Sequence, residues 1–396
     1  MDSLQRLLHS DRTSGVLMLA VMALALAAAN SPLRPLYQAV HHAPVLLRIG
    51  PLILSEPAIG WVNEGLMVFF FLLVGLEIKR EVREGMLASP RRAALALIAA
   101  LGGMAFPALI YVLFTWRDPV AVHGWAIPTA TDIVLALGVL AFLGDRVPAG
   151  LKVFITALAI FDDLGGVVLV GLFYGGEIAR YPLAIAALAA AALAGLTWLR
   201  VARPAPFVAL GLVLWVAMLK SGIPAALAGV IIAFAVPMRT RDGAASPLRA
   251  LEHGLRPWVA LVVIPAFAFF NAGIALDNVG LAALTAPVSL GIALGLFIGK
   301  PLGIGAATWL AVRARAGELP QGVEWRHVLA GGMVAGIGFT LSLYVAALAF
   351  DDPQLINTAK LAILAGSVVS AASGVAVLAK ASRPRCAAQP TRRSAA

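Results

Sequence analysis

Residues 153–173 read VFITALAIFDDLGGVVLVGLF, an apolar run whose only charged members are Asp162 and Asp163. About twenty apolar residues is the length that an α-helix needs to cross the hydrocarbon core of a bilayer. Charged side chains are costly at that depth, so a pair of aspartates there is a functional hypothesis by default. This stretch therefore predicts a membrane-spanning helix that carries chemistry at its midpoint.

Apolar runs of similar length recur along the chain of 396 residues, which is 61% hydrophobic and 13% charged and has a mean hydropathy of +0.92. A soluble domain is nearer half apolar and a quarter charged. We predict an all-α polytopic membrane protein with about twelve transmembrane helices in one domain over residues 1–380. A basic cytoplasmic tail follows over 381–396, and its composition favours disorder. The predicted spans are residues 15–29, 61–78, 93–115, 124–143, 153–173, 182–199, 207–219, 224–237, 258–274, 287–312, 328–350 and 358–378.

The net charge of +10 comes from 30 basic and 20 acidic residues. The basic residues cluster at alternate span ends, which is typical of a membrane protein that keeps positive loops inside, rather than of a nucleic-acid surface. With an even number of spans, both termini lie in the cytoplasm. The lone Cys386 allows neither an intrachain disulfide nor a thiolate metal site. In an outer loop, residues 45–54 are too short to span, and Gly50-Pro51 indicates the turn of a β-hairpin.

Four ionisable residues lie near the middle of predicted spans, each roughly ten residues, or about 15 Å, from a span end. They are Asp132, Asp162, Asp163 and Lys300. Consecutive helical residues point about 100° apart, so one aspartate of the pair can face Lys300 while the other faces an aqueous cavity. The two aspartates are expected to titrate as a coupled unit. A carboxylate that gives up its proton when a hard cation arrives performs antiport in its simplest form.

A structural alternative for this cluster is a buried ion pair that only fixes helix packing. Three carboxylates facing one lysine leave an excess of negative charge, which requires a cation or protons. The charge balance therefore favours an ion-binding site at Asp162, Asp163 and Asp132, with Lys300 as the compensating charge.

Two predicted spans carry helix-breaking residues. Asp132 follows IPTAT at 127–131, and GIGFT at 336–340 interrupts a later span. A pair of interrupted spans, one in each half, is typical of a transporter binding site. Freed carbonyls and the Thr131 hydroxyl can ligate a hard cation, which prefers oxygen. For Gly336, Gly338 and Thr340 an ordinary packing kink is an equal alternative.

Several charged residues near span ends give weaker signals. Glu77, Arg80 and Glu81 are either a functional gate or a plain cytoplasmic boundary. Glu64 either lines an entry passage or is an interfacial acid. Glu252 and His253 either sense pH or belong to a solvated helix end.

The motifs along nearly the whole chain resemble those of the bacterial NhaA sodium/proton antiporters. The resemblance rests on long and specific segments. These are WVNEGLM at 61–67, FFLLVGLEIKRE at 70–81, GWAIP at 124–128, ATD at 130–132, ALAIFDDLG at 157–165, LKSG at 219–222, IGKPLG at 298–303 and GIGFT at 336–340.

The resemblance implies inverted repeats formed by the third to fifth and the tenth to twelfth spans. It implies that Asp163 is the main ligand of the transported sodium, with Asp162 beside it, and that Asp132 and Lys300 tune the charge where two broken helices cross. Electrogenic exchange of sodium or lithium for more than one proton is also implied. So is a homodimer formed through the hairpin at 45–54.

Aspartate is commoner in the family where this chain has Glu64. Better-known members also carry histidine where it has Pro224 and Arg256. Both positions are associated with the pH response, so the pH profile is expected to differ. We predict an antiporter of a bacterial inner membrane that exports sodium and imports protons by alternating access, maintains sodium and pH homeostasis, and uses no cofactor. The rival classes are a passive cation channel and a symporter of an organic solute.

Overall fold

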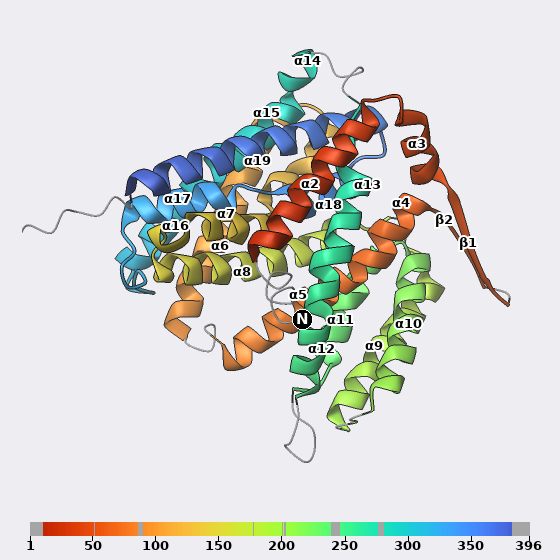
Figure 1. Ribbon diagram of the computed structural model, residues 1–396. Coiled ribbons are helices and arrows are strands. Elements are labelled where there is room, and N and C mark those ends of the chain that lie inside the picture. The colour runs from red at the N-terminus through yellow and green to blue at the C-terminus, as the bar shows by residue number, and fades with distance from the viewer. Residues whose placement is uncertain are drawn as a thin grey trace, which may run out of the picture.

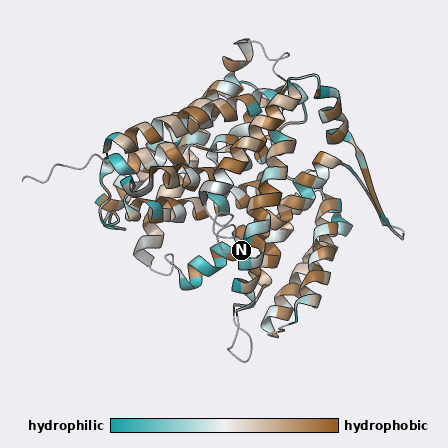
Figure 2. Ribbon diagram, in the orientation of Figure 1, coloured by the Kyte–Doolittle hydropathy of each residue, from teal (hydrophilic) through white to brown (hydrophobic). Residues whose placement is uncertain are grey.

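The computed structural model describes residues 11–50, 52–85, 90–176, 178–199, 201, 203–238, 246–275 and 281–381. In this part of the chain nearly every element is a helix, and the one sheet is a two-stranded antiparallel hairpin. Hydrophobic residues cover the helices along most of their length, as Figure 2 shows. The predicted all-α membrane architecture is therefore confirmed. The predicted tail, after Ala381, lies outside the described residues.

Nine helices among the described residues are long and apolar enough to cross a membrane, and two bent helix pairs and one short apolar helix accompany them. These segments correspond one for one to the twelve predicted spans. In chain order they are α2 (Asp11–Ala29) with α3 (Arg34–His42); α4 (Ala58–Gly60), η1 (Trp61–Leu66) and α5 (Met67–Glu84); α6 (Pro90–Thr115); η3 (Ala121–Thr129) and α7 (Ile133–Leu143); α8 (Ala149–Phe173); α9 (Arg180–Trp198); α10 (Pro204–Ser221); η5 (Ala225–Leu227) and α11 (Ala228–Ala235); α12 (Pro247–Trp258), η6 (Val259–Val263) and α13 (Ile264–Ala272); α15 (Pro287–Leu294), η8 (Gly295–Gly299) and α16 (Lys300–Arg313); α17 (Trp325–Ala335) and α18 (Phe339–Ala349); and α19 (Pro353–Ala381).

The helices form two groups whose axes run in different directions, as Figure 1 shows. One group contains α6, α8, α16, α17 and α19, and the other contains α5, α9, α10, α11 and α12. α5 of the second group packs directly on α8 of the first, and residues 157–164 at the centre of α8 contact Val74 and Ile78 of α5 at this junction.

Glycines allow α6 and α16 to pack backbone to backbone. A Cβ atom added to Gly303 would lie 2.1 Å from the carbonyl oxygen of Gly102, and one added to Gly102 would lie 2.4 Å from the carbonyl oxygen of Gly303. Small residues at helix contacts allow this close approach in membranes. The contact places the first residue of α16, Lys300, deep inside the first group.

The two predicted interruptions are confirmed, and they cross one another. η3 and α7 are separated by an extended turn over residues 130–132, while α17 and α18 are separated at 336–338 and bend by 47°. The backbone N–H of Asp132 donates to the carbonyl oxygen of Ile337 at 2.5 Å, so the interruption at 130–132 is in direct contact with the one at 336–338. Four half-helix ends consequently meet inside the protein.

The predicted β-hairpin is also confirmed. β1 (Pro44–Ile49) pairs with β2 (Leu52–Pro57), and Gly50 at the turn has a φ of +59°. Preceding it, α3 bends by 109° from α2 and caps the carbonyl end of α13. Tyr37 donates to the carbonyl oxygen of Phe269 at 2.7 Å, and a ring nitrogen of His41 lies 2.6 Å from the carbonyl oxygen of Phe270. These bonds hold the hairpin's base against the helix bundle.

Candidate ion-binding site

Lys300 is the centre of a buried charge cluster that joins three spans. Its Nζ donates to Asp162 Oδ2 of α8 at 2.6 Å and to the hydroxyl of Thr131 at 2.8 Å. The side chains of Lys300 and Asp162 are 0% and 1% exposed. The sequence left open which carboxylate pairs with Lys300, and in the structure it is Asp162.

Asp163 is equally deep but differently placed. Its side chain is buried, yet within the described residues no hydrogen bond or ion pair reaches its carboxylate. Oδ1 of Asp162 also lacks a hydrogen-bond partner there. Buried carboxylates are normally paired or hydrogen-bonded, because burial of an uncompensated charge is very unfavourable. The site therefore offers acceptor oxygens from two adjacent residues to a proton or a hard cation.

Asp132 lies where the broken spans cross and is bonded at both oxygens. Oδ1 accepts from the backbone N–H of Leu135 at 2.9 Å, which makes Asp132 the N-cap of α7. Oδ2 accepts from the backbone N–H of Thr340 in the first turn of α18 at 3.1 Å. Helix N-termini carry partial positive charge, so this one carboxylate compensates two half-helices. Asp132 thus links α7 and α18 through the backbone N–H groups of their first turns.

The opposite helix ends face the ammonium group. Thr131 Oγ1, which accepts from Lys300, donates to the carbonyl oxygen of Ala335, the last residue of α17, at 2.8 Å. A helix C-terminus carries partial negative charge, which favours a nearby cation. The positive charge of Lys300 thus compensates the partial negative charge at the C-terminal end of α17. The negative charge of Asp132 compensates the partial positive charges at the N-terminal ends of α7 and α18.

The glycines of the second break are tightly packed. A Cβ atom on Gly336 would lie 2.4 Å from the carbonyl oxygen of Leu296, and one on Gly338 would lie 2.4 Å from Ser342 Oγ. The packing alternative for these two glycines therefore has direct support. Thr340 contributes its backbone N–H to Asp132 and links the break to the charge cluster.

A cavity of about 900 Å³ reaches α8 next to the aspartate pair. Leu164, the residue after Asp163, is part of its wall, and the rest of the wall comes from the ends of α5, α9 and α11 that lie far from the hairpin. The cavity is lined by Ile78, Lys79, Val82, Arg83, Glu84, Leu164, Thr197, Phe234, Pro237 and Met238. The wall is mixed, and its four polar or charged residues, Lys79, Arg83, Glu84 and Thr197, fit an aqueous approach to the centre of α8 from this side.

Most of the weaker charged candidates meet in one ion-pair network between α5 and α12. Arg80 Nε lies 2.9 Å from a Glu252 oxygen, and Arg80 Nη1 lies 2.6 Å from Glu81. Arg256 Nη2 lies 2.6 Å from Glu77 and 3.6 Å from Glu252. This network lies on the same end of α5 as the cavity. It connects residues that the sequence could only name as separate signals.

Two weaker candidates lie elsewhere. Glu64 is half-buried, and its Oε2 accepts from the backbone N–H of Ala225 at 2.6 Å and of Ala226 at 3.4 Å. It therefore caps the start of the short eighth span, at the hairpin end of the protein. His253 of α12 is exposed.

Sequence reasoning did not single out Lys79 or Arg256 as site residues. The Lys79 ammonium donates to the carbonyl oxygens of Phe234 at 2.7 Å and Val236 at 2.6 Å, at the C-terminal end of α11. The brevity of the eighth span was the one available signal, since a short helix leaves carbonyls within reach of a neighbour. Arg256 was noted as a departure from the family pattern, but its two carboxylate partners were not predicted.

Comparison with known proteins agrees with the motifs. The family model of Na+/H+ antiporter 1 matches residues 5–378. Na(+)/H(+) antiporter NhaA 1 of Klebsiella pneumoniae is 50% identical over 378 residues, covering 95% of each chain. Na(+)/H(+) antiporter NhaA of Shewanella loihica is 47% identical over 380 residues, covering 96% of this chain and 97% of the relative. The match therefore covers at least 95% of this chain and of each of these two relatives.

Proposed function

We propose that this chain, which belongs to the Na+/H+ antiporter 1 family, binds sodium and protons in turn at the carboxylate of Asp163. The observation that carries the proposal is the contrast within one helix turn. Asp162 is held by Lys300 at 2.6 Å, whereas Asp163 has no partner among the described residues and lies beside a residue of the cavity wall. A proton or a sodium ion supplies the positive charge that balances this carboxylate.

Competition for the same oxygens couples the two ions. Sodium is a hard cation, for which carboxylate oxygens are suitable ligands. Sodium at Asp163 and the unbonded Oδ1 of Asp162 requires Asp163 to be ionised, and protonation of Asp163 removes that ligand. The two ions therefore occupy the site alternately, which is the condition for exchange rather than for joint transport.

The Lys300–Asp162 pair accounts for electrogenic exchange. When sodium is ligated by both carboxylates it competes with the ammonium for Asp162, and an unpaired ammonium is unfavourable in a fully buried position. If Lys300 releases its proton at that step, two protons leave for one sodium. The site then alternates between a neutral protonated state and a sodium-loaded state with one net negative charge. The same oxygens suit lithium.

The crossed breaks provide the moving part for alternating access. The half-helix ends of the two interrupted spans are capped or compensated by residues of these same spans. The two spans can therefore move together relative to the helix group that contains α5. The cavity near Leu164 is assigned to the cytoplasmic side, and the hairpin to the outside. Both termini are then cytoplasmic, in a bacterial inner membrane.

Two further features belong to the proposal. The exposed strand residues Leu46, Leu47 and Ile53 of the hairpin fit a homodimer formed by its pairing or packing with a second copy. Sodium export coupled to proton entry serves sodium and pH homeostasis.

Exchange by the purified chain in proteoliposomes tests the proposal. An imposed proton gradient is expected to drive sodium against its own gradient, and a membrane potential is expected to change the rate. A passive cation channel would move sodium only down its electrochemical gradient. That outcome, or a rate insensitive to the membrane potential at a clamped proton gradient, would contradict antiport or its electrogenicity, respectively.

A further inference from the structure

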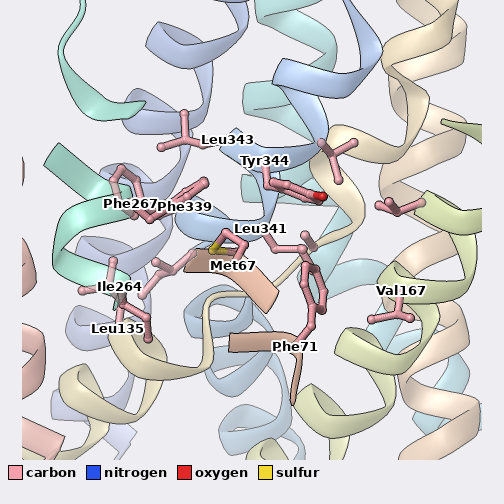
Figure 3. Packing of buried hydrophobic residues seen from close by; sticks show 14 of the residues in the cluster. Met67, Phe71, Leu135, Val167, Ile264, Phe267, Phe339, Leu341, Leu343 and Tyr344 are labelled. Carbon is pink, nitrogen blue, oxygen red and sulfur yellow. The ribbon is translucent and has the colours of Figure 1, made fainter. Parts of the chain in front are cut away.

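The structure closes the aspartate pair on the side away from the cavity with an apolar seal. Val167 lies four residues after Asp163 and so on the same face of α8. Phe71 of α5 and Leu341 of α18 face it, as Figure 3 shows, and both are 1% exposed. Leu341 is pressed against Gly166, where an added Cβ atom would lie 2.8 Å from Leu341 Cδ2. An ion leaving Asp163 towards the hairpin side must pass these side chains.

One hydroxyl group is buried inside this seal. Tyr344 of α18 is 0% exposed, and its ring packs 5.7 Å from Phe71 and 6.4 Å from Phe267, measured between centroids. Among the side chains labelled in Figure 3 it carries the only oxygen, which points away from Phe267 towards the side of Phe71 and Val167. Within the described residues this hydroxyl has no hydrogen-bond partner.

An unpartnered buried hydroxyl is unfavourable in the state that contains it. Phenylalanine would fill the same space without that cost, so packing alone does not explain a tyrosine at this position. The hydroxyl is explained if another state of the protein provides its partner. That state is the one in which the seal opens and water or the transported ion enters from the hairpin side.

We propose that the Tyr344 hydroxyl is a ligand-positioning group of the outward-open route, where it hydrogen-bonds the hydration shell of the cation on its way to or from Asp163. The proposal rests on the antiport function given above and adds a residue that acts on one side of the membrane only. Its location supports this. Tyr344 is one turn after Thr340, whose backbone N–H binds Asp132, so it moves with the crossing.

The test compares the two faces of the membrane in Tyr344→Phe, which removes the hydroxyl alone. Right-side-out and everted vesicles from a bacterium that lacks its own sodium/proton antiporters present the outer and the cytoplasmic face, respectively. We expect the apparent KM for sodium to rise at the outer face by roughly three- to tenfold, the range that one hydrogen bond gives. The KM at the cytoplasmic face is expected to stay the same, and the Tm is expected to stay the same or rise.

Tyr111→Phe is the matched control. Tyr111 is also 0% exposed, but its hydroxyl donates to the carbonyl oxygen of Ala121 at 2.6 Å, so it has a structural role. Loss of this hydroxyl should lower the Tm without changing the KM for sodium at one face of the membrane more than at the other. An unchanged outer KM in Tyr344→Phe, or an equal change at both faces, would overturn the proposal for Tyr344. Loss of exchange by the unmodified chain would instead overturn the antiport function itself.

Discussion

Asp132 and Thr340 are 208 residues apart in the sequence, yet a carboxylate oxygen of Asp132 accepts the backbone N–H of Thr340 at 3.1 Å. The other oxygen of the same carboxylate caps α7. One side chain thus joins the two broken spans at their amide ends. Lys300 joins Asp162, Thr131 and, through Thr131, the carbonyl end of α17. The charge cluster is at the same time the structural centre of the crossing.

Asp163→Asn is expected to abolish sodium/proton exchange while the protein still folds. The amide has the same shape and, unlike the carboxylate, neither titrates nor carries a negative charge that could balance a cation. Since Asp163 has no hydrogen-bond partner to lose among the described residues, the Tm should be unchanged or higher. Exchange by this variant at the rate of the unmodified chain, measured in proteoliposomes, would remove Asp163 from the mechanism.

Lys300→Ala is expected to lower both stability and transport. The substitution leaves the Asp162 carboxylate buried without its partner, which typically costs about 3–5 kcal/mol. Thermal unfolding in detergent measures the effect. The double variant Asp162→Asn with Lys300→Met is the control, because it removes both charges and should recover much of the lost Tm. An unchanged Tm in Lys300→Ala would contradict the pairing.

Asp132→Ala is expected to destabilise the crossing, because it removes two N-terminal caps at once. Each cap is worth about 1 kcal/mol, so a loss of roughly 2 kcal/mol is expected, together with slower exchange. Thr340→Ala is the matched control. This substitution keeps the backbone N–H bond to Asp132 and removes only the contact of the Thr340 side chain with that carboxylate, so the Tm should fall less than in Asp132→Ala. If both variants unfold at the same temperature as the unmodified chain, the carboxylate is not a structural link.

Arg256→His is expected to make activity depend more steeply on pH between about 6 and 8, where an ordinary histidine titrates. Arginine stays charged throughout this range and keeps its contacts with Glu77 and Glu252. A histidine would keep the positive charge only at the lower pH and lose it as the pH rises. Arg256 is about half exposed, so stability should change by about 1 kcal/mol or less. The rate of exchange measured against pH, at a constant proton gradient, tests this expectation. Parallel pH profiles for Arg256→His and the unmodified chain would contradict it.

Much of the fold could be predicted because its main signals are local. Each span is a run of consecutive apolar residues, and the interruptions are marked by Pro128 and by Gly336 and Gly338 within such runs. The hairpin is marked by Gly50 between two short strands. The depth of Asp132, Asp162, Asp163 and Lys300 followed from counting residues along each helix. Long motifs in the same segments led to the family, which the family model and the relatives confirm.

The partners of these residues could not be predicted in the same way. Whether Lys300 meets Asp162 or Asp163 depends on the rotation of α8 about its axis and on the close packing of α16 against α6 at Gly102 and Gly303. Hydropathy is nearly the same on all sides of a buried membrane helix, so it does not specify that rotation. The ion-pair network of Arg256 depends likewise on α5 and α12 being neighbours.

The amino-acid sequence by itself determined that the chain spans a membrane many times, that two spans are broken, and which charges lie at mid-depth. These properties depend on residues that are near one another in the chain. The tertiary structure alone decided that Asp162 is held by Lys300, that Asp163 has no partner among the described residues, and that Asp132 also binds the first turn of α18. The bonds from Lys300 to Asp162 and from Thr340 to Asp132 join residues more than a hundred positions apart, and only the packing of whole helices brings them together.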